Sequence, residues 1–194
     1  EWHRSLSLLD HMLEMKVLPT KITYNIAICA CARGDQWELA LNLLSKLPER
    51  TVLPDQFTYN SAIKACGTGG RWELTLSLLD DMLEMRVDPD QISYNTFITV
   101  CAPAGQWELA LSLVSSMPDL KLTPDIVTYN AAISAFEKVG LWEQALSMLG
   151  YMSEQKAAPD RISYNTAISA CEKGGDWQQG LSLLNSLLGS RHSL

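Results

Sequence analysis

The 194-residue sequence contains no uninterrupted apolar run near the roughly 20 residues needed to span a bilayer, so we expect no membrane insertion. It also lacks an excess of basic residues that would attract nucleic acid, since its formal net charge is −7. Disorder is excluded by composition, because 47% of the residues are hydrophobic and only 19% are charged. The composition therefore predicts an ordered, soluble protein. Whether its charge permits nucleic-acid binding depends on where the charged residues lie.

The sequence also lacks the common signatures of catalysis. It has no Gly-rich phosphate loop, no His-x-Glu with Cys-x-x-Cys and no Gly-x-Ser-x-Gly. Its histidines are His3, His11 and His192, which lie near the ends of the chain and accompany no recurring carboxylate, serine or cysteine. We therefore expect neither enzyme activity nor a cofactor.

What the sequence does contain is an internal repeat. Tryptophan recurs every 35 residues, at Trp2, Trp37, Trp72, Trp107, Trp142 and Trp177. A second series runs in step with it, in which proline is followed four residues later by Thr/Ser-Tyr-Asn, and its prolines are Pro19, Pro54, Pro89, Pro124 and Pro159. Five occurrences without insertion or deletion exclude chance.

Each repeat divides into two amphipathic stretches. The first, which we call helix A, begins near Thr23 and carries apolar residues at helical spacing, and the second, helix B, begins at Trp37 with the same pattern. Proline ends the preceding helix, and the following Asp, Thr or Ser can cap the next one. The glycines between the two helices suit a left-handed turn; they are Gly34, Gly69, Gly70, Gly105, Gly140, Gly174 and Gly175. Sustained period-2 alternation is absent, which argues against strands.

Stacked helical hairpins form a solenoid, so we predict an all-α, right-handed α-solenoid. A single domain is expected over residues 1–194, with five A helices and six B helices. Its repeats are a partial repeat with helix B only (1–20), four full repeats (21–55, 56–90, 91–125 and 126–160) and a last repeat without its terminal Asp (161–194). Because the sequence begins inside a repeat, any targeting segment is expected upstream.

The repeated cysteines and tryptophans are expected to pack rather than react. One cysteine per repeat occupies the same place in helix A, and phenylalanine replaces it in the fourth repeat; the residues are Cys31, Cys66, Cys101, Phe136 and Cys171. A position that accepts phenylalanine is a packing position, so no metal site is expected. The lack of a disulfide pattern fits a reducing compartment. The tryptophans could stack on bases, but their spacing before Ala and Leu favours packing between hairpins.

Two polar series allow two interpretations. One asparagine recurs in the first turn of helix A, where Ala, Glu or Gln would form helix better; these are Asn25, Asn60, Asn95, Asn130 and Asn165. One aspartate recurs after proline, at Asp55, Asp90, Asp125 and Asp160. Both series could satisfy local backbone groups. Alternatively, both could face an open groove and bind something repetitive.

The repeated pattern resembles the plain 35-residue class of pentatricopeptide repeats. The residues that carry the resemblance are Ile/Val-Thr/Ser-Tyr-Asn, the Gly-containing turn, Glu-x-Ala-Leu-x-Leu-Leu and Pro-Asp, and they cover essentially the whole chain. The resemblance implies that helix A lines a groove in which each repeat reads one base of single-stranded RNA with two or three side chains.

The resemblance also implies roles for individual residues. The base-reading pairs would be Asn25 with Asp55, Asn60 with Asp90, Asn95 with Asp125, and Asn130 with Asp160, while Asn165 has no aspartate partner in this chain. An Asn–Asp pair resembles the uridine-preferring combination of the family. The residues that would wedge between bases are Ile22, Phe57, Ile92, Val127 and Ile162, and those that would meet phosphates are Arg33, Lys138 and Lys173. Thr68 and Pro103 replace the phosphate cation in the second and third full repeats.

The charge distribution gives only weak support to the placement of RNA along helix A. The first fourteen residues of the five helix A segments carry a net charge of +4, so the acidic excess lies on the reading aspartates, helix B and the connections. We expect a uridine-preferring RNA binder acting in organellar RNA metabolism or RNA processing, in a chloroplast or other plastid or in a mitochondrion. The alternative is a non-catalytic scaffold that binds protein subunits of a larger assembly.

Overall fold

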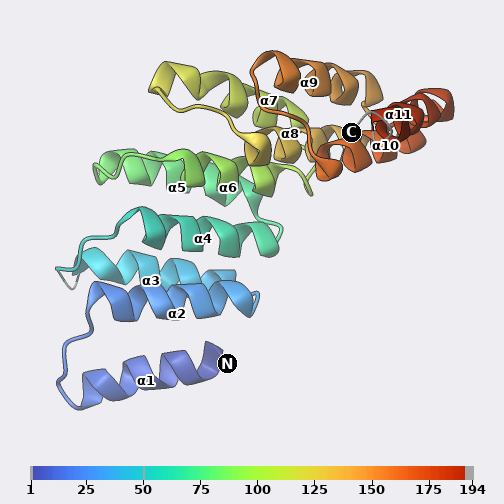
Figure 1. The fold of residues 1–194 in the computed structure, drawn as a ribbon. Coiled ribbons are helices and arrows are strands. Elements are labelled where there is room, and N and C mark those ends of the chain that lie inside the picture. Colours follow the sequence, from blue (N-terminus) through green and yellow to red (C-terminus); the bar gives the residue numbers. More distant parts are fainter. Residues whose placement is uncertain (1, 50, 191–194) are drawn as a thin grey trace. The chain divides into compact units, whose positions relative to one another are not determined.

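The chain folds into helical hairpins, and the computed structural model describes residues 2–49 and 51–190 (Figure 1). The helices A are α2 (Lys21–Arg33), α4 (Gln56–Thr68), α6 (Gln91–Cys101), α8 (Ile126–Val139) and α10 (Arg161–Gly174). The helices B are α1 (Trp2–Glu14), α3 (Trp37–Glu49), α5 (Trp72–Glu84), α7 (Trp107–Ser116), α9 (Trp142–Glu154) and α11 (Trp177–Ser190), with a short 3-10 helix, η1 (Pro118–Leu120), after α7. The prediction of stacked helical hairpins is confirmed over the described residues, which contain no strand, although helix A begins two residues before Thr23.

An aspartate caps the start of helix A through a reciprocal pair of hydrogen bonds. Asp55 Oδ1 accepts the amide N–H of Thr58 at 3.0 Å, and the Thr58 hydroxyl accepts the amide N–H of Asp55 at 3.1 Å. The same pair of bonds joins Asp90 to Ser93, Asp125 to Thr128 and Asp160 to Ser163. These hydrogen bonds confirm the predicted capping role of the aspartates. An N-cap of this kind contributes about 1 kcal/mol to the stability of the fold.

Each of the four full repeats turns twice through a left-handed residue, and the two end repeats show one such turn each among the described residues. After helix A these residues are Asp35, Gly70, Gly105, Gly140 and Gly175, and after helix B they are Lys16, Thr51, Arg86, Lys121 and Lys156. The prediction was wrong for Gly69 and Gly174, which do not have a positive φ, and for Gly34, which has a φ of −100° while the neighbouring Asp35 takes the left-handed conformation at 56°. Gly34 serves a different purpose, since the ring of Trp2 lies against it.

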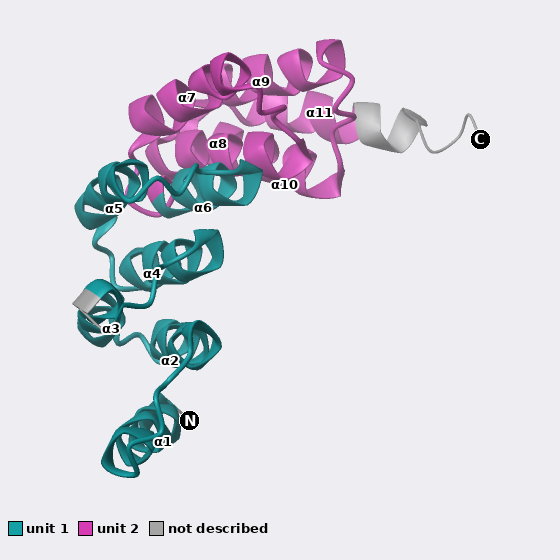
Figure 2. Cartoon of the chain, turned by 90° about the vertical axis from the view of Figure 1, so that its left-hand side faces the viewer, with its two compact units in different colours: residues 1–100 teal, residues 101–194 magenta. Residues whose placement is uncertain are grey.

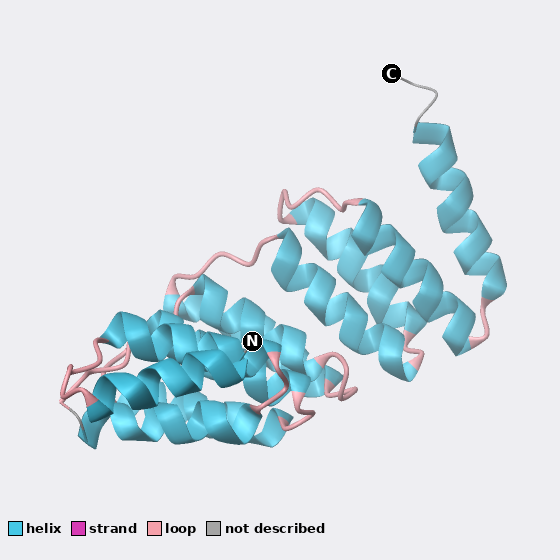
Figure 3. Ribbon diagram, turned by 90° about the horizontal axis from the view of Figure 1, so that it is seen from below, coloured by secondary structure: helices cyan, strands magenta, loops and turns pink. Residues whose placement is uncertain are grey.

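The helices fall into two compact units, residues 1–100 and 101–194, with the boundary inside the third full repeat (Figure 2). In unit 1, α2 packs against α1, α3 and α4, and α4 packs against α3 and α5. In unit 2, α8 packs against α7, α9 and α10, and α10 packs against α9 and α11. Short loops join the helices (Figure 3), and a helix A within each unit contacts both a neighbouring helix A and two helices B. The expectation of a single domain stays a prediction.

The repeated cysteine position belongs to the core, as predicted. Cys31, Cys66 and Cys171 are fully buried, and Phe136, which replaces cysteine in the fourth full repeat, is 2% exposed. Burial raises the pKa of the Cys66 thiol to about 11, so it stays protonated at neutral pH. Among the described residues no cluster of His, Cys, Asp and Glu could hold a metal, and no helix is both long and apolar enough to cross a membrane.

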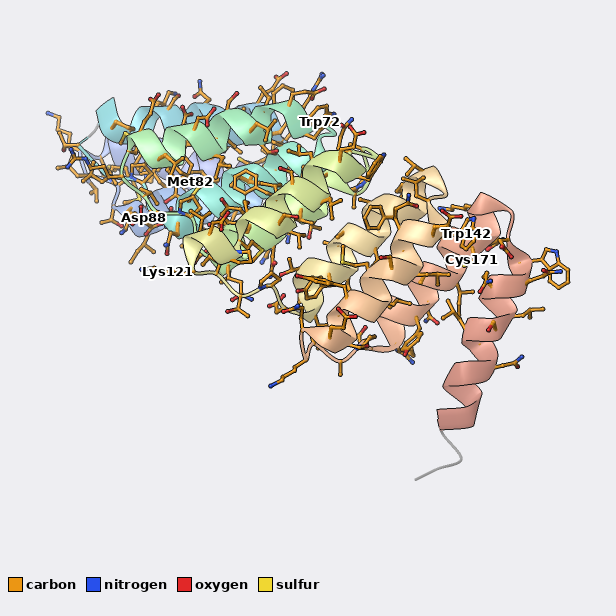
Figure 4. All side chains as sticks on the ribbon, turned by 90° about the horizontal axis from the view of Figure 1, so that it is seen from above. Trp72, Met82, Asp88, Lys121, Trp142 and Cys171 are labelled. Atoms are coloured by element: carbon orange, nitrogen blue, oxygen red, sulfur yellow. The ribbon has the colours of Figure 1, made fainter. Side chains whose placement is uncertain are left out.

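Three of the tryptophans, Trp2, Trp37 and Trp142, pack against the following hairpin, which confirms the packing interpretation for them, whereas Trp177 in the last repeat is 65% exposed. A Cβ atom at Gly34, Gly69 or Gly174 would lie 2.2, 2.3 or 2.4 Å from the ring of Trp2, Trp37 or Trp142, respectively. In unit 2, Trp142 lies at the start of α9 beside α10, the helix that carries Cys171 (Figure 4). Glycine at the end of helix A therefore gives room for the tryptophan that opens the preceding helix B.

Candidate functional site

An exposed apolar residue recurs at the start of helix A. These residues form the apolar row and are 57–68% exposed: Ile22, Phe57, Ile92, Val127 and Ile162. Single exposed apolar side chains are common, but the same exposed position in five repeats indicates a surface that contacts something apolar or planar. The structure thus places all five predicted wedge residues at the surface.

In unit 1, the first reading pair forms a hydrogen-bonded cluster with the next helix A. Asn25 Nδ2 donates to Asp55 Oδ1 at 3.4 Å, and Asn25 Oδ1 accepts from the Thr58 hydroxyl at 2.7 Å. Thr58 also donates its amide N–H to Asp55 Oδ1 at 3.0 Å, and its hydroxyl oxygen lies 2.8 Å from the same carboxylate atom. The asparagine therefore links its own helix to the cap of the following helix, and its role in base reading stays a prediction.

In unit 2, the pair Asn130–Asp160 repeats this geometry. Asn130 Nδ2 donates to Asp160 Oδ1 at 3.2 Å, and Asn130 Oδ1 accepts from the Ser163 hydroxyl at 2.6 Å. The amide of Ser163 is the main reason that the pKa of Asp160 lies below its ordinary value, and the Ser163 hydroxyl and Asn130 amide contribute. The second N–H of Asn130 makes no hydrogen bond with described residues, and Asp160 Oδ2 accepts none from a described side chain, so the pair offers a donor and an acceptor.

The other predicted reading residues differ from these two pairs. Asn60 lies in unit 1 with Asp90, but its Oδ1 atom is buried without a hydrogen-bond partner among the described residues. Asn95 lies in unit 1 and Asp125 in unit 2. Asn165 is exposed. The buried Asn60 oxygen is an acceptor that a ligand or water can satisfy.

The aspartate of the first predicted reading pair forms an ion pair with a lysine. Lys21 Nζ lies 2.8 Å from Asp55 Oδ2, and the two side chains are 46% and 37% exposed. Although partial burial opposes ionisation of Asp55, its bonds to Lys21 and Thr58 outweigh that effect and hold its pKa at about 2. The carboxylate is therefore ionised throughout the physiological pH range.

The predicted phosphate-binding cations are all at the surface, but one of them already has a partner. Arg33 and Lys138 are exposed. Lys173 forms an ion pair with Glu137 of the preceding helix A, and the Ser169 hydroxyl donates to the same carboxylate at 2.9 Å. Partial burial of Glu137 opposes its ionisation, yet Lys173 and Ser169 hold its pKa below the ordinary value. Glu137 thus competes with a phosphate for Lys173.

A cavity of about 510 Å³ in unit 1 brings the three kinds of predicted site residue together. Its walls include the reading residue Asn25, the apolar-row residue Phe57 and the cation Arg33. The tryptophan Trp2 and the half-buried Cys29 complete the apolar part of the lining. A hollow with an apolar wall, an amide and a guanidinium has the chemical groups that hold a planar polar ring next to an anion.

Four participants in the site were missed in the sequence. The Thr58 and Ser163 hydroxyls were expected only to cap helices, although each also bonds to the asparagine of the preceding repeat. Lys21 and Glu137 were counted only as charges, and their partners lie more than thirty residues away along the chain. The recurrence of Thr or Ser two residues before the asparagine was the available signal for the hydroxyls.

Comparison with known proteins agrees with this architecture. The PPR repeat family matches residues 23–68, 89–136 and 124–173, and the PPR repeat matches residues 57–87 and 162–192. No curated protein sequence gives a significant match. The crystal structure of the pentatricopeptide repeat protein PPR10 from maize has a TM-score of 0.82 and 27% identity, covering 97% of this chain and 27% of that one.

Two further solved structures contain RNA. PPR10 in complex with an 18-nt psaJ RNA element has a TM-score of 0.74 and 29% identity, covering 89% of this chain and 26% of that one. The PPR domain of Arabidopsis thaliana protein-only RNase P 1 in complex with tRNA has a TM-score of 0.65 and covers 94% of this chain and 90% of that one. At 17% identity, the latter likeness concerns the fold alone. The chain thus spans about a quarter of the length of PPR10, and it belongs to the pentatricopeptide repeat family.

Proposed function

We propose that this chain binds single-stranded RNA along its helices A, with about one base per complete repeat and a preference for uridine. The observation that carries the proposal is the exposed apolar row beside the asparagine–aspartate pairs. Stacking of a base on an exposed apolar or aromatic side chain contributes affinity without regard to sequence. The adjoining polar pair can then select the base.

The polar groups of Asn130 and Asp160 are suited to this task. A free amide N–H beside a carboxylate oxygen complements a carbonyl oxygen beside an imino N–H, which are neighbouring groups on the Watson–Crick edge of uracil. The choice of uridine over other bases rests on the resemblance of the Asn–Asp pair to the family's uridine-preferring combination. Similarity to PPR10, which was crystallised with an RNA element, supports RNA as the ligand class.

The test is binding of the chain to uridine-rich and adenine-rich oligonucleotides at low salt, measured by fluorescence anisotropy. We expect tighter binding to the uridine-rich strand and loss of part of that preference in Asn130→Ala. Val127→Ala should weaken binding to both strands, because it removes a stacking surface. Gly150→Ala on helix B is the matched control and should change neither the affinity nor the preference for uridine.

Equal binding of the wild type to both oligonucleotides, or no binding at low salt, would contradict the proposal for this chain and favour the protein-scaffold alternative. Thermal unfolding of each variant, monitored by circular dichroism, separates loss of binding from loss of folding. The proposed role in organellar RNA metabolism rests on the family resemblance alone. Localisation of the full-length protein to the cytosol would contradict that role without affecting RNA binding.

A further inference from the structure

We propose that Lys21 changes the base preference of the first complete repeat from uridine towards cytidine. This inference rests on the proposed function, because it concerns which base the Asn25–Asp55 pair selects. Lys21 begins α2 and Asp55 caps α4, and their side chains meet with Nζ at 2.8 Å from Oδ2. The lysine thus binds the carboxylate oxygen that takes no part in the helix cap.

The equivalent residues in the second and fourth full repeats do not have this contact. Gln56 occupies the same place in the second full repeat, and it donates its Nε2 to the backbone carbonyl of Asp88 at 2.8 Å. Ile126 occupies the place in the fourth and has no charge. Neither Asp90 nor Asp160 forms an ion pair with a described residue. The first pair therefore differs from these two by a cation at its acceptor.

The hydrogen bonds define which groups each pair can still offer. In the first pair, Asp55 Oδ1 accepts from Thr58 and Asn25, and Asn25 Oδ1 accepts from the Thr58 hydroxyl. Lys21 takes one lone pair of Asp55 Oδ2 and brings its remaining ammonium N–H groups to the pair as donors, in addition to the second N–H of Asn25. The first pair thus offers two donors, whereas the Asn130–Asp160 pair offers a donor and an acceptor.

This difference acts on N3 of the base, where uracil is a hydrogen-bond donor and cytosine an acceptor. Uracil carries a proton on N3 and needs an acceptor there, whereas N3 of cytosine is itself an acceptor beside the O2 carbonyl. Two neighbouring donors therefore match cytosine and leave the N3–H of uracil facing a cation. Both side chains are partly exposed, so the ion pair itself adds little stability, and its effect lies in the groups presented to the base.

The experiment exchanges the residue between repeats in the full chain. Lys21→Gln installs the residue found at this place in the second and third full repeats, and Ile126→Lys brings a lysine to the pair that lacks one. Each protein is titrated with a short uridine oligonucleotide and with versions in which one uridine at a time is replaced by cytidine. Asn130→Ala serves as the control for base selection itself.

For the wild type we expect one position at which cytidine is preferred over uridine by about fivefold, roughly the contribution of one hydrogen bond. Lys21→Gln should reverse the preference at that position only. Ile126→Lys should create a second position that prefers cytidine. Because the two substitutions act in opposite directions, a folding defect in one variant does not remove the test.

Two results would overturn the inference while leaving RNA binding intact. The first is a uridine preference at every position that Lys21→Gln does not change. The second is an equal loss of affinity of Lys21→Gln for all oligonucleotides with a weaker salt dependence, which would make Lys21 a phosphate contact. Failure of the proposed function looks different, because the wild type would then show no base preference and Asn130→Ala would have no effect.

Discussion

The indole ring of Trp37 lies directly against the backbone of Gly69, where a Cβ atom would come within 2.3 Å of ring atom Cδ1. Trp37 opens α3 and Gly69 follows α4, so this contact joins helix B of one repeat to helix A of the next. The contacts of Trp2 with Gly34 and of Trp142 with Gly174 have the same geometry. Close approach of a large ring to glycine is therefore a means of stacking the hairpins.

Gly69→Ala should destabilise the chain by about 1–3 kcal/mol, because the added methyl group displaces the Trp37 ring. The control is Gly150→Ala in α9, where no heavy atom lies within 4 Å of a Cβ. That variant should gain about 0.5–1 kcal/mol from the better helix propensity of alanine. Urea unfolding followed by circular dichroism measures both, and equal stability of the two variants would contradict the stacking role.

Asn25→Ala should lower stability by about 1–2 kcal/mol, because Asn25 is buried and bonds to both Thr58 and Asp55. Asn60→Ala should change stability by less than about 0.5 kcal/mol, because its buried oxygen has no partner among the described residues to lose. Urea unfolding followed by circular dichroism compares the stabilities of the two variants. A larger loss for Asn60→Ala would show that its oxygen is satisfied in solution.

Lys21→Gln should raise the pKa of Asp55 from about 2 towards its ordinary value of 3.8, since Lys21 is the leading group that lowers it. A carboxyl with a depressed folded-state pKa stabilises the fold above pH 3.8, and this contribution is lost as the pH falls to about 2. The variant should therefore lose less stability over that range than the wild type. An NMR titration measures the pKa, and Asp160, which lies in unit 2, should be unchanged.

Thr68→Lys should strengthen RNA binding and make it more sensitive to salt. Thr68 ends α4 at the place that Arg33 and Lys138 occupy in other repeats, and it is exposed. One new phosphate contact on a single strand steepens the plot of log affinity against log salt by about 0.7. Ser77→Lys on helix B adds the same charge away from helix A. An equal change in both variants would mean that only net charge matters.

Periodicity alone predicts most of this fold, because each repeat fixes its own helices through local spacing and caps. Trp37 and Asp55 mark where helices begin, and both positions agree with the structure. The left-handed turn after helix B was not visible in the sequence, since Lys16 and Arg86 are not residues that signal positive φ. Gly34 was misassigned because glycine serves both left-handed turns and close contacts, and local sequence does not distinguish them.

The candidate site was predictable in its parts but not in its connections. The positions of Asn25 and Phe57 follow from the repeat, and the structure finds Asn25 buried and Phe57 exposed. The partners Lys21 and Asp55 meet only because successive helices A lie side by side. Such contacts depend on side-chain placement between repeats, which a single-sequence pattern does not specify.

The hydroxyl of Thr58 or Ser163 holds the asparagine of the preceding repeat and also forms part of the next helix cap. A repeat of this chain is consequently not an interchangeable module. Replacing Asn25 or Asn130 removes an acceptor from the hydroxyl of the following repeat and leaves that hydroxyl only its contacts within the cap. Under the proposed function, a substitution that changes the base read by one repeat therefore also alters the helix cap of the next.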